Sequence, residues 1–240
     1  MNHAKQDNRS YYDEFSKWYE NERHHGYHAL IDDLEFDLLA PYLKGKDVLE
    51  IGCGTGLILE RAADLAKTAT GIDISEGMLR YAVDRGLDGV LADVTHLPFA
   101  DESFDVVYSF KVLAHVKDID LALKEMLRVT RPGGTLVLEF YNRMSGRYLA
   151  KRIGGPQKIS SQTNEGAVFT RWDSPADLTR RLPMNASIKD FAGVRVLTPF
   201  AGIHKVPVLN KLIAKGEFLA RDSALKYLGG FLIMIATKDS

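Results

Sequence analysis

Three glycines stand at alternate positions in this chain, directly after a short apolar segment that contains Glu50. They are Gly52, Gly54 and Gly56. An apolar-periodic segment over 57–65 follows, so the pattern predicts a strand, a tight turn and a helix. At the carboxyl end of a parallel strand, glycines let a ligand approach the backbone, and the first helical turn presents unpaired N–H groups. The stretch therefore predicts a cofactor-binding turn.

Charge and spacing indicate which class of ligand this turn binds. The dinucleotide-binding pattern G-x-G-x-x-G needs its third glycine where this chain has Leu57. Glu50 argues against a phosphate, because a carboxylate repels phosphate and attracts an ammonium group. Asp73 ends a second apolar run, and an acid at the tip of the neighbouring strand is placed to accept both hydroxyls of a ribose. The predicted ligand is nucleoside-like, with a cationic end and a free diol.

Five motifs in this order resemble those of the class I S-adenosylmethionine-dependent methyltransferases, most closely the branch of ubiquinone and menaquinone biosynthesis. They occupy residues 47–56, 70–75, 92–94, 104–107 and 131–134. The resemblance implies transferase activity with S-adenosyl-L-methionine as cofactor. It also implies an α/β fold: a doubly wound, Rossmann-like, mostly parallel sheet of seven strands with an antiparallel last strand.

The resemblance also implies roles for single residues. It places an N-terminal helix over the methionine end of the cofactor with Tyr19 in contact, and Asp93 as acceptor for the adenine amino group. Core packing is the alternative for Met78, and capping of a turn is the alternative for Asp93. The full set of expected cofactor-binding residues is Tyr19, Glu50, Gly52, Gly54, Thr55, Gly56, Asp73, Ile74, Met78, Asp93, Val94 and Phe110.

His115 is the candidate catalytic base. It lies on the loop between an expected strand over 104–110 and an expected helix over 119–129. A histidine with a pKa near 6.5 can accept a proton at neutral pH, and this loop borders the place where the methyl group should point. The alternative role is to order the loop through hydrogen bonds. That role is favoured because many family members carry a histidine here although they methylate different acceptors.

The elements that position these residues divide the chain into three parts of one methyltransferase domain, 1–240. Residues 1–44 are expected to form a helical lid, because Tyr11, Phe15, Trp18 and Tyr19 recur at helical spacing. Residues 45–141 form the cofactor-binding half, in which 131–134 is expected to be a turn. Residues 142–240 form the acceptor-binding half, with a late insertion and final strands at 194–197 and 231–236.

The late segment 203–213 is unusually apolar for a connection between strands. We expect it, together with Tyr12 and Tyr19, to wall an apolar acceptor pocket above Phe110 and His115, with Leu209 and Leu212 among its contacts. Pro207 should prevent one continuous helix through the segment. Because this segment combines apolar residues with lysines, transient contact with a membrane surface is a further expectation.

Composition excludes several classes of protein. The chain has 31 basic and 32 acidic residues, so no basic excess predicts nucleic acid as a partner. Cys53 is the only cysteine, which argues against disulfides and cysteine-rich metal sites. We expect His24, His25 and His28 to be solvated and no metal to be bound. No apolar run reaches membrane-spanning length, so the expected location is the cytoplasm, without stable membrane insertion.

The predicted function is transfer of the sulfonium methyl group to an O, N or C nucleophile of a small, apolar or aromatic molecule. Holding the nucleophile near the methyl group and excluding water can supply most of the acceleration, so a dedicated base is optional. One alternative is a non-catalytic S-adenosylmethionine-binding or regulatory protein. A less favoured alternative is a nicotinamide oxidoreductase on the same sheet.

Overall fold

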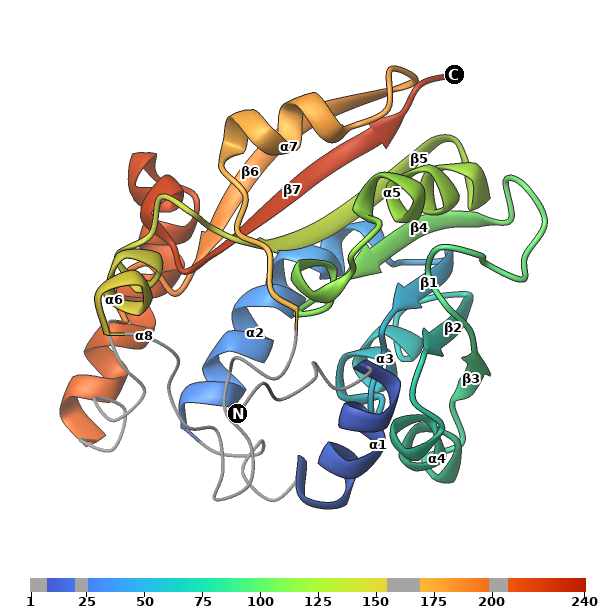
Figure 1. Ribbon diagram of the computed structural model, residues 1–240, viewed down its shortest axis with the longest axis horizontal. Coiled ribbons are helices and arrows are strands. Elements are labelled where there is room, and N and C mark those ends of the chain that lie inside the picture. Colours follow the sequence, from blue (N-terminus) through green and yellow to red (C-terminus); the bar gives the residue numbers. More distant parts are fainter. Residues whose placement is uncertain (1–7, 20–25, 155–168, 199–206) are drawn as a thin grey trace, which may run out of the picture.

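A seven-stranded sheet forms the centre of the computed structural model, with the order β3-β2-β1-β4-β5-β7-β6 (Figure 1). The structure describes residues 8–19, 26–154, 169–198 and 207–240. Strands β1 to β5 pair in parallel, and β7 runs antiparallel between β5 and β6. The predicted fold class is therefore confirmed. The strands are β1 Asp47–Ile51, β2 Thr68–Asp73, β3 Asp88–Leu91, β4 Phe104–Ser109, β5 Thr130–Tyr141, β6 Ala186–Val194 and β7 Phe231–Lys238.

Helices cover both faces of the sheet. Successive side chains along a strand therefore pack into different cores. In β1, Val48 packs in the core that contains α2 and α3, whereas Leu49 packs in the core that contains α5 and α7. Burial on both faces explains why the central strands are almost continuously apolar. The longer helices are α1 Asn8–Tyr19, α2 Tyr27–Leu39, α3 Leu57–Ala63, α4 Glu76–Asp84, α5 Ile119–Val129, α6 Gly146–Gly154, α7 Pro175–Arg181 and α8 Pro207–Arg221. Short 3₁₀ turns are η2 Ala40–Tyr42, η3 Leu113–His115 and η5 Ala224–Leu228.

Local signals in the sequence account for several helix boundaries. Helix α5 has the predicted limits. Ser75 caps α4, since its hydroxyl accepts a hydrogen bond from the Met78 amide at 3.1 Å. Pro41 lies in η2, directly after α2 ends, because proline removes a backbone donor and interrupts a helix. Pro207 is the first residue of α8, a position where its missing N–H is not needed.

Two predictions about strands were wrong. The strand expected at 194–197 instead spans Ala186–Val194, an edge strand whose first half is polar and partly exposed, which hides its pattern. The segment 131–134 was expected to be a separate turn but belongs to β5. The β4 to β5 register passes from Phe104↔Thr130 to Val106↔Thr135, so the additional residues form a bulge, with Gly133 at φ +72°.

The N-terminal helix α1 packs on α4 at one end of the molecule (Figure 1). Asp13 fastens the two helices together, because its Oδ1 accepts hydrogen bonds from the Ser75 hydroxyl at 2.6 Å and from the Gly77 amide at 3.0 Å. Gly77 permits this approach, since a Cβ there would lie 2.9 Å from the Ser16 hydroxyl oxygen. A helix expected to act as a lid is therefore docked by specific contacts.

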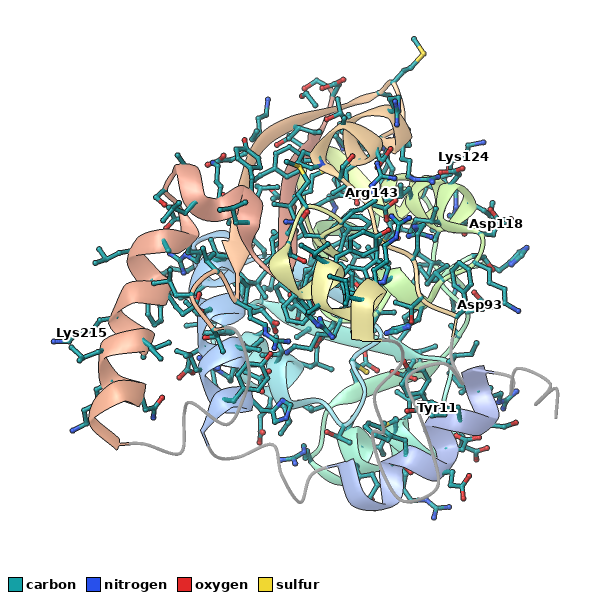
Figure 2. All side chains as sticks on the ribbon, turned by 60° about the vertical axis from the view of Figure 1, so that its left-hand side comes forward. Tyr11, Asp93, Asp118, Lys124, Arg143 and Lys215 are labelled. Atoms are coloured by element: carbon teal, nitrogen blue, oxygen red, sulfur yellow. The ribbon has the colours of Figure 1, made fainter. Side chains whose placement is uncertain are left out.

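Helix α8 packs on α2 and β6 with one face and leaves its other face exposed. Figure 2 shows Lys215 pointing outward from this helix. Leu212 was expected to line the acceptor pocket but is 63% exposed, and the Leu209 side chain lies outside the described residues. Within the described ranges, no helix is long and apolar enough to cross a bilayer.

Candidate functional site

The glycine loop between β1 and α3 has left-handed backbone at all three alternate glycines. Their φ values are +73° for Gly52, +57° for Gly54 and +88° for Gly56. A Cβ at Gly52 would lie 2.2 Å from Val112, and one at Gly56 would lie 2.5 Å from Leu87. A Cβ at Gly54 would meet no atom within 4 Å. Gly52 and Gly56 are thus required by packing, whereas Gly54 leaves open space.

That open space belongs to a cavity of about 420 Å³ at the carboxyl ends of β1, β2 and β4. A cavity of this size is typical of a small-molecule site. Gly56 does not line it, and the Tyr19 side chain lies outside the described residues. The other expected site residues do line it: Glu50, Gly52, Gly54, Thr55, Asp73, Ile74, Met78, Asp93, Val94, Phe110 and His115.

Asp73 connects the glycine loop to the start of α4. Its Oδ2 accepts a hydrogen bond from the Gly54 amide at 2.9 Å, and its Oδ1 accepts one from the Ser75 amide at 2.9 Å. Burial raises the pKa of Asp73, while these two amides act in the opposite direction. Each carboxylate oxygen has a second lone pair. Asp73 can therefore hold the loop and still accept hydrogen bonds from a ligand.

Glu50 brings a buried acid to the floor of the cavity. Its side chain accepts a hydrogen bond from the Tyr108 hydroxyl at 3.2 Å, and burial raises its pKa well above the usual range. A cation placed beside Glu50 would favour the ionised form and so lower that pKa. Close by, the buried Thr55 hydroxyl has no hydrogen-bond partner in the described part of the chain. Both groups have unused capacity for a polar ligand.

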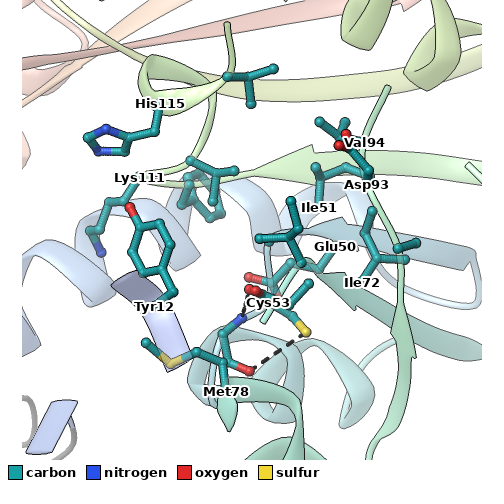
Figure 3. A pocket seen from close by; sticks show the side chains of 18 of the residues that line it. Tyr12, Glu50, Ile51, Cys53, Ile72, Met78, Asp93, Val94, Lys111 and His115 are labelled. Atoms are coloured by element: carbon teal, nitrogen blue, oxygen red, sulfur yellow. Dashed lines mark hydrogen bonds between the residues drawn. The ribbon is translucent and has the colours of Figure 1, made fainter. Parts of the chain in front are cut away.

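Asp93 and Val94 lie on the opposite side of the cavity from Tyr12 and His115 (Figure 3). Asp93 caps its turn, since Oδ1 accepts hydrogen bonds from the Thr95 amide and hydroxyl, both at 2.8 Å. It also lines the cavity, so the capping alternative and the binding role are compatible. The Met78 side chain is 3% exposed and belongs both to the core and to the cavity wall.

His115 is held in one tautomer. Its Nδ1 lies 2.8 Å from the Phe169 carbonyl oxygen; because a carbonyl can only accept, Nδ1 carries the hydrogen and Nε2 carries the lone pair. Burial lowers the pKa of His115 below its ordinary value, as do the positive charges of Lys151, Arg147 and Arg171. The imidazole is therefore neutral at pH 7 and can accept a proton at Nε2.

Tyr12 of the lid helix faces His115 across this end of the cavity (Figure 3). The two ring centroids are 6.5 Å apart with an interplanar angle of 66°. Tyr12 lines the cavity, as expected for a residue of the acceptor pocket. The cavity thus has one polar end around Asp73 and Asp93 and one aromatic end around Tyr12 and His115.

Lys111 is a lining residue that the sequence did not identify. Its Nζ lies 2.7 Å from both Asp32 Oδ1 and Glu35 Oε2 on α2, and its backbone N–H donates to Glu139 Oε1 at 3.0 Å. Burial and the nearby charge of Glu35 raise the pKa of Glu139 well above the usual range. The backbone of Lys111 is left-handed, with a φ of +62°. In the sequence, the only local feature that could have identified this residue is its charge directly after an apolar strand.

Side chains that commonly bind metals do not form a metal-binding cluster in the described ranges. No group of three or more His, Cys, Asp or Glu side chains there is arranged to hold a metal ion. His24 and His25, which were expected to be solvated, lie outside the described residues.

Comparisons with known proteins agree with this geometry. A family model described as a methyltransferase domain matches residues 49–138. The chain is 31% identical over 199 residues to a ubiquinone biosynthesis O-methyltransferase of Coxiella burnetii, which covers 79% of this chain and 78% of that protein. It is 31% identical over 154 residues to a demethylmenaquinone methyltransferase of Corynebacterium glutamicum, which covers 59% of this chain and 67% of that protein.

Solved structures share the fold at lower identity. An S-adenosylmethionine-dependent methyltransferase from Mesorhizobium loti has a TM-score of 0.61 and 21% identity over 87% of this chain and 98% of that one. The [4+2]-cyclase SpnF has a TM-score of 0.68 and 22% identity over 98% of this chain and 96% of that one. The second is named for a cyclisation, so likeness at this level concerns the fold, and function must be argued from the residues.

Proposed function

We propose a reaction and an acceptor class from the premise that this chain belongs to the S-adenosylmethionine-dependent methyltransferases. Its cofactor is S-adenosyl-L-methionine and its substrate is a small molecule. The nicotinamide and non-catalytic alternatives are therefore set aside. The finer proposal is transfer of the methyl group to a hydroxyl oxygen of an aromatic small molecule. The observation that carries it is the fixed tautomer of His115 beside Tyr12 in the cavity.

The lining residues fit this cofactor. When bound, S-adenosylmethionine supplies a methyl group on a positively charged sulfur. Glu50 would pair with its ammonium group, and Asp73 would accept hydrogen bonds from the ribose hydroxyls. Asp93 and the Val94 amide would meet the adenine ring at the far side. The open space at Gly54 supports this placement, as does the Thr55 hydroxyl, which has no partner among the residues that the structure describes.

His115 and Tyr12 would act on the acceptor. While the acceptor oxygen would bond to the methyl carbon and the methyl–sulfur bond would break to release S-adenosylhomocysteine, Nε2 of His115 would take the hydroxyl proton and later pass it to solvent. Tyr12 presents an aromatic side chain against which an aromatic acceptor can pack. The lid helix excludes water from this end of the cavity, which favours the displacement. Positioning and a neutral base together would supply the acceleration.

A panel of acceptors tests the proposal. The purified protein is incubated with S-adenosylmethionine and with matched aromatic and aliphatic compounds that carry a hydroxyl, an amino group or neither. We expect S-adenosylhomocysteine to form with the hydroxyl compounds and mass spectrometry to find one added methyl group on oxygen. Turnover of the amino compounds alone, or of aliphatic compounds in preference to aromatic ones, would contradict the proposal.

A further inference from the structure

Arg147 of α6 lies inside a group of aromatic rings. Its Cζ is 4.8 Å from the ring centroid of Tyr141, 5.0 Å from that of Phe231 and 5.5 Å from that of Trp172. Rings at these distances attract a guanidinium through their faces and exclude water from it. The three rings come from β5, β7 and the segment before α7, so the tertiary structure has assembled them around one cation.

The rings stabilise the positive charge of Arg147, but they do not provide a hydrogen-bond acceptor for each of its N–H groups. Among the described residues, its buried Nη1 has no hydrogen-bond partner, and no carboxylate forms an ion pair with this side chain. Two nearby arginines differ: Arg143 pairs with Asp177 at 2.8 Å and Arg171 pairs with Asp173 at 2.8 Å. A buried donor without an acceptor is costly, so a native structure that keeps one calls for a partner.

Arg147 lies behind the aromatic end of the cavity and does not itself line it. The Tyr141 ring that it covers is 5.4 Å, centroid to centroid, from the ring of His115, and His115 in turn faces Tyr12 in the cavity. The contacts therefore run from the cavity through His115 and Tyr141 to the guanidinium. Lys151 adds a second positive charge here, with Nζ 5.4 Å from the Trp172 ring centroid.

We propose that Arg147 binds a carboxylate of the methyl acceptor, which makes the acceptor an aromatic acid whose hydroxyl lies at His115. The inference rests on the proposed function and names its substrate class. A guanidinium suits a carboxylate because its planar N–H groups match the two oxygens, and the unpartnered Nη1 is a donor for one of them. The ring of such an acceptor would pack against Tyr12, which lines the cavity.

Paired ligands that differ only in charge test this inference. The protein, saturated with S-adenosylhomocysteine, is titrated in a calorimeter with 3,4-dihydroxybenzoate and with its neutral amide, 3,4-dihydroxybenzamide. We expect the acid to bind at least tenfold more tightly than the amide. Arg147→Met should reduce this preference to less than threefold, and Arg147→Lys should retain part of it. Arg152→Met, an exposed cation on the same helix, should leave the preference unchanged.

The affinity for S-adenosylhomocysteine separates the two proposals. It should change less than twofold in every variant, since Arg147 does not line the cofactor cavity. Equal binding of acid and amide by the wild type, no measurable binding of the acid, or an unchanged preference in Arg147→Met would overturn the role of Arg147. Methyl transfer to neutral aromatic hydroxyls would then still stand, whereas a protein that binds no S-adenosylhomocysteine would contradict the proposed function itself.

Discussion

His115 shows at the scale of one residue how a hydrogen bond prepares a side chain for chemistry. Donation from Nδ1 to the Phe169 carbonyl orders the loop and places the lone pair on Nε2. The loop-ordering role and the role of base, which were alternatives in the sequence, therefore use different nitrogens of one ring. The two roles can be separated only by a variant that keeps one nitrogen's function and removes the other's.

His115→Asn is that variant, because its amide can still donate toward Phe169 while the group equivalent to Nε2 is lost. If His115 is the base, we expect both His115→Asn and His115→Ala to lower kcat by about 10²–10⁴-fold with an unchanged cofactor dissociation constant. Since burial lowers the pKa of His115, wild-type activity should be constant at neutral pH and fall as the pH drops through a value below about 6.5. Near-normal turnover of His115→Asn with loss in His115→Ala would leave only the loop-ordering role.

Gly54 allows a second test at this scale, because the chain offers a matched control. Gly54 and Gly86 both have positive φ, +57° and +81°, and both have open space around a new Cβ, but only Gly54 lines the cavity. Gly54→Val and Gly86→Val should each lose about 1–3 kcal/mol of stability through backbone strain. Only Gly54→Val should abolish S-adenosylmethionine binding. Calorimetry and urea unfolding measure the two effects, and tight binding by Gly54→Val would remove the cofactor from this turn.

At the scale of the element, helix α1 places Tyr12 at the cavity, and Asp13, the next residue, holds the helix in position. Asp13 accepts two hydrogen bonds from the start of α4, and Gly77 leaves room for the helix to approach. The hydrogen bonds from Ser75 and then Gly77 lower the pKa of Asp13. The docked position is thus favoured while this carboxyl is ionised, and it weakens as the pH falls through the depressed pKa.

Asp13→Ala should therefore undock α1 without unfolding the sheet. We expect faster amide hydrogen exchange over residues 8–19 and a loss of kcat/KM of about tenfold, because Tyr12 no longer closes the cavity. The melting temperature should change little, since no residue of α1 belongs to the two main hydrophobic clusters on the sheet. Glu14→Ala, an exposed acid on the same helix, is the control. Equal exchange in the two variants would show that Asp13 does not dock the lid.

At the scale of the whole molecule, Lys111 joins parts of the chain that are distant in sequence. Its Nζ reaches α2 across 76 and 79 positions, and its N–H reaches Glu139 of β5. Asp32, Glu35 and Glu139 form an acidic group around this one lysine, beneath the cavity wall. Removing Lys111 takes away the ammonium group that pairs with Asp32 and Glu35 in this buried group.

Lys111→Met should destabilise the protein by about 3 kcal/mol in urea unfolding at pH 7.5. The loss should be smaller at pH 5.5, because the raised pKa values of Glu35 and Glu139 rise further without the lysine, so a larger fraction of these two acids is then neutral. Lys67→Met removes a lysine that is 65% exposed in its ion pair with Asp47 and should cost less than about 1 kcal/mol. Equal effects of the two substitutions would contradict a stabilising role for Lys111.

The sequence by itself determined the features whose causes are local. The glycine turn, the Ser75 cap and the acid at the end of β2 each follow from a few adjacent residues, and parallel strands bring their carboxyl ends to one edge of the sheet. Most of the expected cofactor residues therefore line one cavity. The edge strand β6 was misplaced because a polar, half-exposed strand has weak alternation.

Only the tertiary structure decided the features that depend on distant segments. Two acids of α2 reach Lys111, three rings from separate segments surround Arg147, and Leu212 faces outward although its segment is apolar. None of these has a periodicity to detect, because each pairing arises from where strands and helices pack and not from spacing along the chain. Many residues of the cofactor half could be predicted from sequence because they lie at the ends of consecutive strands. The contacts of the acceptor half could not, because they join segments that are distant in the chain.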